Sequence, residues 1–354
     1  MKKGSLVIKV LFKCVSFLAI FLVIGAGLSK LLIPKWVEWD QSDTLYSLPE
    51  DSLDVLFVGS SSFYVGFSPA VFWQENGINS YVCGSSVQAP QVTYLKVADA
   101  LKTQKPKVVV LGTLSLFTNY DVDAHETYVR LGVDPLRLSP EKLAVAANIA
   151  QKSESQSVIS YLFPLLRYHD RWKEITQEDY FATPNHDIER GRSTYMQNKI
   201  QKMDHFYGRM ERTGKAAAPN AESLAYYQKA IELCLSQGIE VVLVTAPRED
   251  WSTGRYLGVQ QLADQYGLTY LDYNFDEMMD AIDLNLDTDF YNEGHLNIQG
   301  AYKFSKHVAG YLQQQYALPD RRGEADLAAS WEKDADSFYW DLRCFQEDIL
   351  PNAE

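Results

Sequence analysis

The chain has 354 residues, of which 46% are hydrophobic and 22% charged, a balance that is typical of globular proteins and excludes wholesale disorder. Its formal net charge is -13 and no long Lys/Arg run offsets it, so the surface would repel phosphate backbones and no nucleic-acid partner is expected. The four cysteines form no CxxC pair, which excludes a zinc knuckle or a disulfide scaffold.

The N-terminus predicts a membrane anchor. Residues 14–29 carry no charge, and the run to Ile33 supplies about the twenty residues that a membrane-spanning helix needs. Four lysines precede the run and two follow it, so the positive-inside rule predicts a cytoplasmic N-terminus and an extracytoplasmic body. A cleavable signal peptide, processed near the small residues 25–27, is the alternative. The length of the run and an interfacial Trp36 favour an uncleaved anchor over residues 1–35, followed by a linker over 36–50.

The next part of the chain alternates predicted strands and helices. Short apolar runs predict strands at residues 54–59, 79–83, 108–111, 239–245 and 268–271. Helices are predicted between them: one begins at Ser68-Pro69, one covers residues 90–103, and one begins at Asn220 and ends at Gly238. This alternation predicts an α/β fold with a parallel sheet covered on both faces and ligands bound at the carboxyl ends of its strands.

Two segments depart from this alternation. Residues 120–219 are polar, aromatic and mixed in charge, and we expect a mostly helical insertion there, within an α/β domain that covers residues 51–318. Residues 319–354 form a separate tail. Apolar side chains recur in the tail at three- to four-residue steps, which predicts an amphipathic helix docked on the body or on a partner; they are Leu327, Trp331, Ala335, Phe338 and Leu342.

Residues that could do chemistry follow three of the predicted elements. Gly59-Ser60-Ser61-Ser62 follows the first strand, where a serine hydroxyl can project from the sheet edge, although such serines are more often turn or cap residues. Cys83-Gly84-Ser85 follows the second, where glycine lets a backbone N–H approach a ligand. Residues 289–297 (DFYNEGHLN) place His295 just before a C-terminal helix, with carboxylates upstream, as a general base and its orienting group require.

Together, the order and spacing of these three blocks resemble the SGNH (GDSL-type) hydrolase superfamily over roughly residues 51–120 and 221–318. The N-terminal anchor is similar to its membrane-anchored, extracytoplasmic branch, which includes the D-alanyl transfer protein DltD and the alginate-acetylation proteins of the AlgJ/AlgX kind. The resemblance implies a flavodoxin-like three-layer sandwich. It also implies that Ser61 is the nucleophile, that His295 is the general base, and that the N–H groups of Ser61 and Gly84 form the oxyanion hole.

The chain departs from the superfamily pattern in two places. The third block is G-x-N-D in the superfamily but Gly112-Thr113-Leu114-Ser115 here, so the asparagine that donates to the oxyanion is absent, a loss that typically costs about 10²–10³ in rate. In addition, Asn292 stands three residues before His295 where the superfamily has aspartate. Either Asn292 or a nearby carboxylate, Asp289 or Glu293, is therefore expected to orient His295, and Asp289 is the preferred carboxylate.

Two further segments are candidate substrate-binding sites. Residues 161–172 are rich in aromatic and basic side chains, and Arg167, His169 and Trp172 could roof the site and bind a sugar. The alternative is a helix that packs Leu162, Leu165, Leu166 and Trp172 against the sheet with its charged side chains in water. Arg248 follows the fourth strand and lies at the expected ligand edge.

These features predict a membrane-anchored, extracytoplasmic serine esterase or O-acyltransferase that acts on acyl groups of a cell-envelope polysaccharide or a teichoic-acid-like polymer. No metal ion or organic cofactor is required for this chemistry. The resemblance implies a multi-pass acyltransferase of the MBOAT type as a partner. The alternative is a catalytically degenerate SGNH fold that binds polysaccharide or scaffolds such an acyltransferase, which the two departures favour. Cys83 is expected to be a buried spectator.

Overall fold

A parallel sheet of five strands forms the centre of the molecule. The computed structural model describes residues 2–181, 188–193, 197–203 and 210–352. The strand order is β2-β1-β3-β6-β7, which is the flavodoxin-like order 2-1-3-4-5 when the strands are counted along the chain. The predicted α/β class and the five predicted strands are confirmed; the observed strands are β1 (Val55–Gly59), β2 (Ser80–Gly84), β3 (Val108–Gly112), β6 (Glu240–Thr245) and β7 (Thr269–Asp272).

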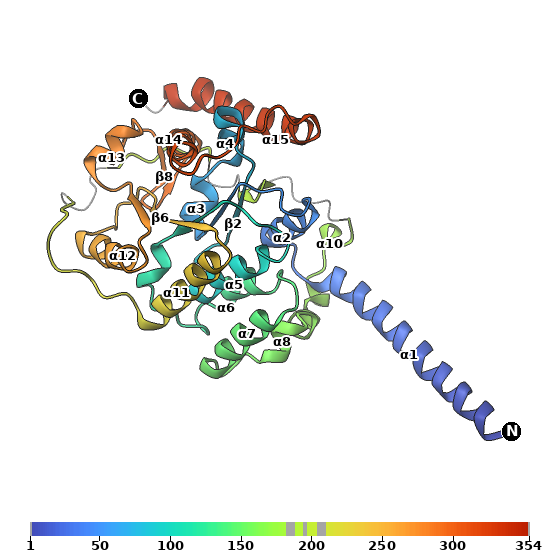
Figure 1. Cartoon of the computed structure of the whole chain (residues 1–354). Helices are drawn as coiled ribbons and strands as arrows, with labels where there is room; N and C mark the ends of the chain where they lie inside the picture. Colours follow the sequence, from blue (N-terminus) through green and yellow to red (C-terminus); the bar gives the residue numbers. More distant parts are fainter. Residues whose placement is uncertain (1, 182–187, 194–196, 204–209, 353–354) are drawn as a thin grey trace.

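Helices cover both faces of this sheet, so the body has three layers (Figure 1). The first face packs against α3 (Ser61–Gly66), α4 (Pro69–Asn76) and α14 (Ile298–Tyr316). The second packs against α5 (Pro90–Ala100), α11 (Ala221–Ser236) and α12 (Thr253–Tyr266). A shorter helix, α13 (Asp276–Ala281), follows β7.

The two layers of core follow from the period of two in the strands. Along β1, Val55 and Phe57 enter the core beneath α14, whereas Leu56 and Val58 enter the core beneath α11. All four side chains are fully buried. A strand that is apolar on both faces is what a doubly covered parallel sheet requires, and this explains why the sequence shows continuous apolar runs.

Side-chain caps fix where two of the long helices begin. The Asn220 side chain accepts hydrogen bonds from the backbone N–H groups of Glu222 and Ser223, as the predicted helix start requires. Asn297 caps α14 in the same way, and its side-chain amide donates to the carbonyl of Thr288 at 2.7 Å. The cap of α14 thus also secures the preceding loop, which carries His295.

The C-terminal tail folds as the predicted amphipathic helix, α15 (Ala325–Cys344), followed by the short turns η3 (Phe345–Ile349) and η4 (Leu350–Asn352). Its predicted apolar face is largely buried, and Trp331 stacks on Trp73 of α4 with ring centroids 5.4 Å apart. The Trp331 indole also donates to the Asn79 side chain at 3.1 Å. The helix therefore docks on the body of its own chain.

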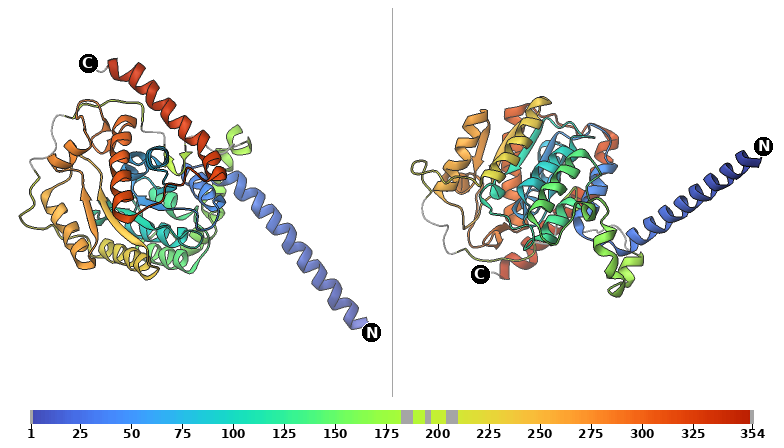
Figure 2. Two further views of the ribbon diagram at one scale, coloured as in Figure 1. Left: turned by 45° about the horizontal axis from the view of Figure 1, so that its top comes forward. Right: turned by 90° about the horizontal axis from the view of Figure 1, so that it is seen from below.

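The first helix, α1 (Lys2–Leu32), projects from the body as a single rod (Figures 1 and 2). An 18-residue stretch within its segment Ile8–Leu32 has a mean hydropathy of 2.3, and the segment is long and apolar enough to cross a membrane. A second helix, α2 (Val37–Ser47), follows and packs on the body. Trp36, between the two helices, makes an edge contact with the Tyr168 ring at 5.7 Å.

The segment between β3 and α11 is mostly helical where the structure describes it. Parts of the expected insertion, residues 182–187, 194–196 and 204–209, lie outside the described residues. The described elements are η1 (Leu114–Phe117), α6 (Glu126–Val133), α7 (Pro140–Lys152), α8 (Val158–Leu162), α9 (Leu165–Tyr168), η2 (His169–Lys173), α10 (Gln177–Phe181) and the small hairpin β4 (Ile188–Glu189) and β5 (Arg192–Ser193).

Candidate active site

The turn from β1 into α3 presents Ser61 at the carboxyl edge of the sheet. Ser60 is the N-cap residue and Ser61 is the first residue of α3. The turn is tight because α3 folds back over the end of β1: a Cβ added at Gly59 would lie 2.6 Å from the Phe63 ring. Only glycine fits there. The backbone N–H of Ser61 lies in the first turn of the helix and therefore has no carbonyl acceptor within α3.

A second segment brings a histidine to Ser61 from the other end of the chain. β8 (Phe290–Asn292) and β9 (His295–Leu296) form a short hairpin just before α14. The hairpin is anchored by Phe290, which is fully buried, and by the backbone hydrogen bond from Asn297 to Asp289 at 3.0 Å. Its turn contains Glu293 and Gly294, so Asn292 and His295 face each other across it.

Ser61, His295 and Asn292 form one continuous hydrogen-bonded chain. The Ser61 Oγ lies 2.7 Å from His295 Nε2, and His295 Nδ1 lies 2.7 Å from Asn292 Oδ1. This is the arrangement of a nucleophile, a general base and an orienting group.

The backbone determines which imidazole nitrogen carries the proton. Gly294 N–H donates to Asn292 Oδ1 at 3.0 Å, and because a backbone N–H can only donate, this atom of the amide must be the oxygen. The oxygen can only accept, so His295 Nδ1 must carry the proton. His295 Nε2 is then unprotonated and can accept the Ser61 hydroxyl proton. Asn292 thus selects the tautomer that a general base requires.

Burial and a neighbouring cation keep His295 neutral. Desolvation, the larger cause, and the positive charge of Arg248 together lower its pKa to about 4. The imidazole is therefore an unprotonated base at neutral pH. Asn292 carries no charge that would oppose this shift, whereas an aspartate at the same position would raise the pKa.

Arg248 lies at the site, as expected from its place after β6. Its backbone N–H donates to Asn274 Oδ1 at 2.8 Å, and its guanidinium pairs with Asp250. A Cβ added at Gly294 would lie 3.6 Å from the guanidinium, which places this cation beside the β8–β9 turn. Arg248 is thus the predicted substrate-binding residue that the structure brings to His295.

The structure corrects the preference for Asp289 as the orienting carboxylate. The Asp289 side chain is fully buried, and its Oδ2 accepts from Lys303 at 2.9 Å and from the Asn285 backbone at 2.8 Å. Glu293 instead accepts from the Gln201 side chain at 2.7 Å. The hairpin explains why Asn292, and not Asp289, contacts the imidazole. Asn292 is the direct cross-strand partner of His295, whereas Asp289 precedes β8 and lies outside the paired residues.

Gly84 has a packing reason to be glycine. It is the last residue of β2 and pairs with Gly59 of β1. A Cβ added to it would lie 2.5 Å from the Cβ of Tyr64 on α3, so any side chain would displace that helix. Its carbonyl accepts from the buried Lys96 at 2.5 Å. The adjacent Cys83 is buried, and desolvation raises the pKa of its thiol to about 12, as a spectator requires.

Leu114 occupies the place where the resemblance leads one to expect an asparagine, and Thr113 precedes it. The Thr113 hydroxyl lies 2.6 Å from that of Thr245, so the two threonines join the ends of β3 and β6. Beside them is a cavity of about 10 Å³, the space of one water molecule. The Ser60 hydroxyl lines it and is buried without a hydrogen-bond partner among the described residues. The sequence did not predict a buried position for Ser60, because nothing in a run of three serines indicates which of them is buried.

The structure does not bring Arg167, His169 and Trp172 to the site, which corrects the expectation that residues 161–172 roof it. Arg167 pairs with Glu126 of α6 at 2.7 Å, and His169 and Trp172 are exposed. The segment contacts α7 and the end of α1 (Figure 1). The packing alternative is also wrong in part, because the buried side chains are Tyr161 and Tyr168, whereas Leu166 and Trp172 are exposed.

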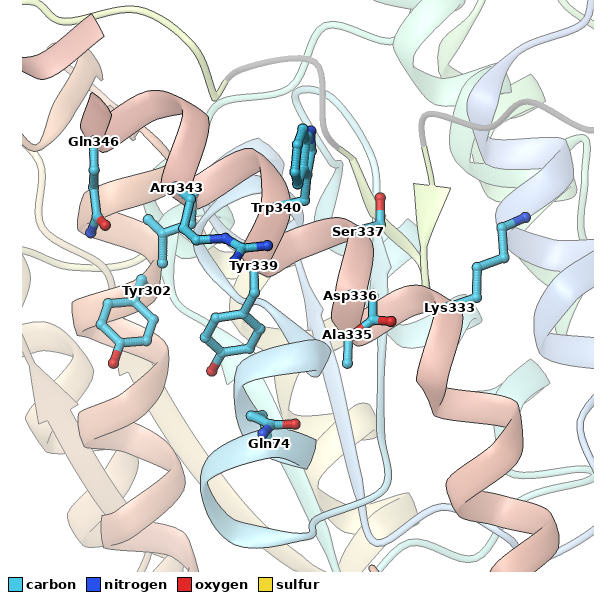
Figure 3. A pocket seen from close by; sticks show the side chains of 11 residues that line it. Gln74, Tyr302, Lys333, Ala335, Asp336, Ser337, Tyr339, Trp340, Arg343 and Gln346 are labelled. Carbon is cyan, nitrogen blue, oxygen red and sulfur yellow. The ribbon is translucent and has the colours of Figure 1, made fainter. Parts of the chain in front are cut away.

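A groove of about 950 Å³ lies along α15, away from the Ser61–His295 pair. Figure 3 shows Tyr302, Tyr339 and Gln74 below α15 and Trp340 above it. None of the residues that line the groove contacts Ser61, His295 or Asn292 through a described hydrogen bond. Among the described residues, no group of three or more His, Cys, Asp or Glu side chains is placed to hold a metal ion.

Comparison with known proteins adds little to this geometry. No family model and no curated protein matches the chain. Among solved structures, one match is a candidate acylhydrolase from Bacteroides fragilis, with 11% sequence identity and a TM-score of 0.38 over 78% of this chain and 95% of that one. These values are too low to support a functional assignment, so the function proposed below depends on the residues around Ser61.

Proposed function

We propose that the protein is a serine esterase or O-acyltransferase in which Ser61 is the nucleophile. One observation carries this proposal: the Ser61 hydroxyl lies 2.7 Å from a neutral imidazole whose other nitrogen is held at 2.7 Å by Asn292. A serine hydroxyl is a weak nucleophile until an adjacent base can accept its proton. The hydrogen-bonded chain supplies that base in the required tautomer.

In the proposed reaction, Ser61 Oγ attacks the acyl carbonyl while its proton moves to His295 Nε2. The Ser61 N–H, at the start of α3, donates to the developing oxyanion. Collapse of this intermediate releases the alcohol, which takes the proton from His295, and leaves an acyl-serine. Water or a second hydroxyl, deprotonated by His295, then attacks the acyl-serine; the bond from Ser61 Oγ to the acyl carbon breaks, and His295 returns the proton to Ser61 Oγ. The resemblance implies that the Gly84 N–H also donates to this oxyanion, and we keep that role beside the close packing of β2 on α3 at this glycine.

We further propose that this chemistry takes place outside the cell membrane. The support is the apolar length of α1 and the excess of lysines before it. A fixed tether restricts the enzyme to substrates near the membrane, and an acylated cell-envelope polymer fits that restriction. Arg248 is the group that we assign to an anionic part of the substrate. A multi-pass acyltransferase would be a donor of acyl groups to Ser61.

A fluorophosphonate probe tests this proposal, because it reacts with activated serines without a known substrate. The full-length protein in detergent is labelled and mapped by peptide mass. We expect labelling confined to Ser61 and lost in Ser61→Ala and His295→Ala. The matched control is Ser62→Ala, which removes the neighbouring hydroxyl of α3 and should be labelled at the wild-type rate.

A non-catalytic binding or scaffold function is the second candidate, and one observation favours it: Leu114 stands where the superfamily has the asparagine of its third block, so this position supplies no side-chain amide to an oxyanion. The labelling experiment separates the two candidates. A folded wild-type protein that is not labelled at Ser61, with circular dichroism unchanged, would favour the scaffold function.

A further inference from the structure

Four apolar side chains lie exposed along one stretch of the body, and we call them the α8–η2 face. They are Ile159 of α8, Phe163, Leu166 of α9 and Trp172 of η2, and each is more than half exposed, from 52% for Leu166 to 62% for Trp172. Large apolar side chains that gather on an otherwise folded surface usually mark an interaction site.

This face adjoins the point where α1 leaves the body. Helix α1 contacts α9, η2 and α10, and the Arg171 guanidinium donates to the carbonyl of Leu32, the last residue of α1, at 2.8 Å. Figure 2 shows this segment at the base of α1 in both views. If α1 spans the bilayer up to Leu32, the α8–η2 face is held at the level of the outer lipid headgroups.

The chemistry of the face fits a lipid surface at that depth. Tryptophan is enriched at the boundary between headgroups and acyl chains, and exposed Leu, Ile and Phe gain free energy by entering the acyl region. The charges around it are mixed: Arg167 is paired with Glu126, and Lys173 lies over the Trp172 ring at 5.4 Å. The attraction would therefore be mainly hydrophobic, with little dependence on anionic lipid.

We propose that the α8–η2 face inserts into the outer leaflet as a second membrane contact, beside the spanning helix. This inference depends on the membrane anchoring proposed above, but it goes further, because a tether alone leaves the body free to turn. Two contacts fix the orientation of the body relative to the bilayer.

A series of short contacts links the segment after α1 to the candidate active site. Glu38 of α2 lies six residues after Leu32; burial raises the pKa of its carboxyl, and the backbone of Ser86 partly offsets that rise. The Ser86 hydroxyl in turn lies 2.8 Å from that of Tyr64, one turn after Ser61 on α3. These contacts connect the membrane end of the chain to the edge of the sheet that carries Ser61.

The test uses the full-length protein in phosphatidylcholine nanodiscs with a nitrobenzoxadiazole label on one cysteine. Cys14 and Cys344 are accessible and are replaced by serine, whereas Cys83 and Cys234 are buried and are kept. The label is then attached to the cysteine introduced by Phe163→Cys. We expect a blue-shifted emission that is quenched by spin-labelled lipid. The matched control is Trp340→Cys, which is 61% exposed on α15 and should be neither shifted nor quenched.

Two results would overturn the inference: emission at residue 163 that stays unquenched, as expected of a face kept for a protein partner, or equal quenching at residues 163 and 340. A label on the native Cys14, in α1, reports the anchor separately. Quenching at Cys14 without quenching at 163 would refute only the second contact. Absence of quenching at both would refute the anchor, and fluorophosphonate labelling of Ser61 would still report the proposed chemistry.

Discussion

Two regions were predicted from the sequence to take part in the site: the carboxyl edge of the sheet and residues 161–172, which we call the α8–η2 segment. Only the edge of the sheet forms the candidate site. Ser61 and His295 are 234 residues apart in the chain and lie in hydrogen-bond contact. Arg167 and Trp172, in a segment dense with aromatic and basic residues, lie instead beside the end of α1. Position after a strand therefore located the site, whereas a composition suited to sugar binding did not.

The largest expected effect comes from Asn292→Ala, which removes the group that holds the imidazole. Loss of the correct tautomer costs up to about 10⁴ in rate in serine proteases, so we expect a fall of about 10²-fold or more in the rate constant for fluorophosphonate labelling. The control is Glu293→Gln, in the same turn, whose carboxylate contacts Gln201. A labelling rate within twofold of wild type in Asn292→Ala would remove Asn292 from the site.

Asp289→Asn should lower the free energy of unfolding but leave the labelling rate unchanged. It leaves Lys303 without its buried partner, and breaking a buried ion pair costs about 3–5 kcal/mol in the free energy of unfolding. The labelling rate of the folded protein should not change, because Asp289 makes no described hydrogen bond to His295. Urea denaturation measures the first quantity and probe labelling the second.

The control for that substitution is Asp283→Asn, because Asp283 also lies near Lys303, at 3.6 Å, but is exposed. Its effect on stability should be within about 1 kcal/mol, as for other surface pairs. If Asp289→Asn slowed labelling as much as Asn292→Ala without loss of stability, the carboxylate would belong to the site after all.

The sequence predicted the sheet well because each strand is apolar on both faces and ends at a glycine or a polar residue. Residues 55–59 form one apolar run, which predicts a strand. Asn220 is a residue type that commonly caps helix N-termini, which predicts the start of a helix. These are local signals, and local rules are enough to interpret them. The predicted nucleophile and base needed one more step, namely that parallel strands end at a common edge.

The sequence could not determine what long-range packing decides. Asn292 and Asp289 were equal candidates, because the choice depends on the pairing of Asn292 with His295 in a two-strand hairpin and on Lys303, eleven residues after Asn292. The packing of Gly84 could not be predicted either, since the Tyr64 side chain that leaves no room for a Cβ there comes from another element. Contacts between residues of different elements produce no periodic pattern in a single sequence, so they could not be predicted from it.

Removing the charge of Arg248 should change the pH dependence of labelling. In the wild type His295 has a pKa of about 4, so the rate should hold at neutral pH and fall only as the imidazole is protonated near that value. Arg248→Gln removes a cation that lowers this pKa, so the acid limb should move to higher pH. The limb should stay below pH 6.5, the ordinary pKa of histidine, because burial is the larger cause of the shift.

Rate constants at several pH values measure this shift. The control is Arg255→Gln, which removes another partner of Asp250 but not the cation beside Gly294, and should leave the acid limb in place. An acid limb at the same pH in Arg248→Gln and the wild type would show that Arg248 does not act on His295.

The smallest effect is expected from Arg167→Ala, which tests whether the α8–η2 segment takes part in the candidate site. Arg167 is half exposed, so the loss of its pair with Glu126 should cost no more than about 1 kcal/mol in the free energy of unfolding. The labelling rate should stay within about twofold of wild type, in line with other surface substitutions away from a site. A slower rate at unchanged stability would place the α8–η2 segment over Ser61, contrary to the packing of that segment against α6 and the end of α1. An unchanged rate would leave membrane contact as the function that accounts for its exposed aromatic and aliphatic side chains.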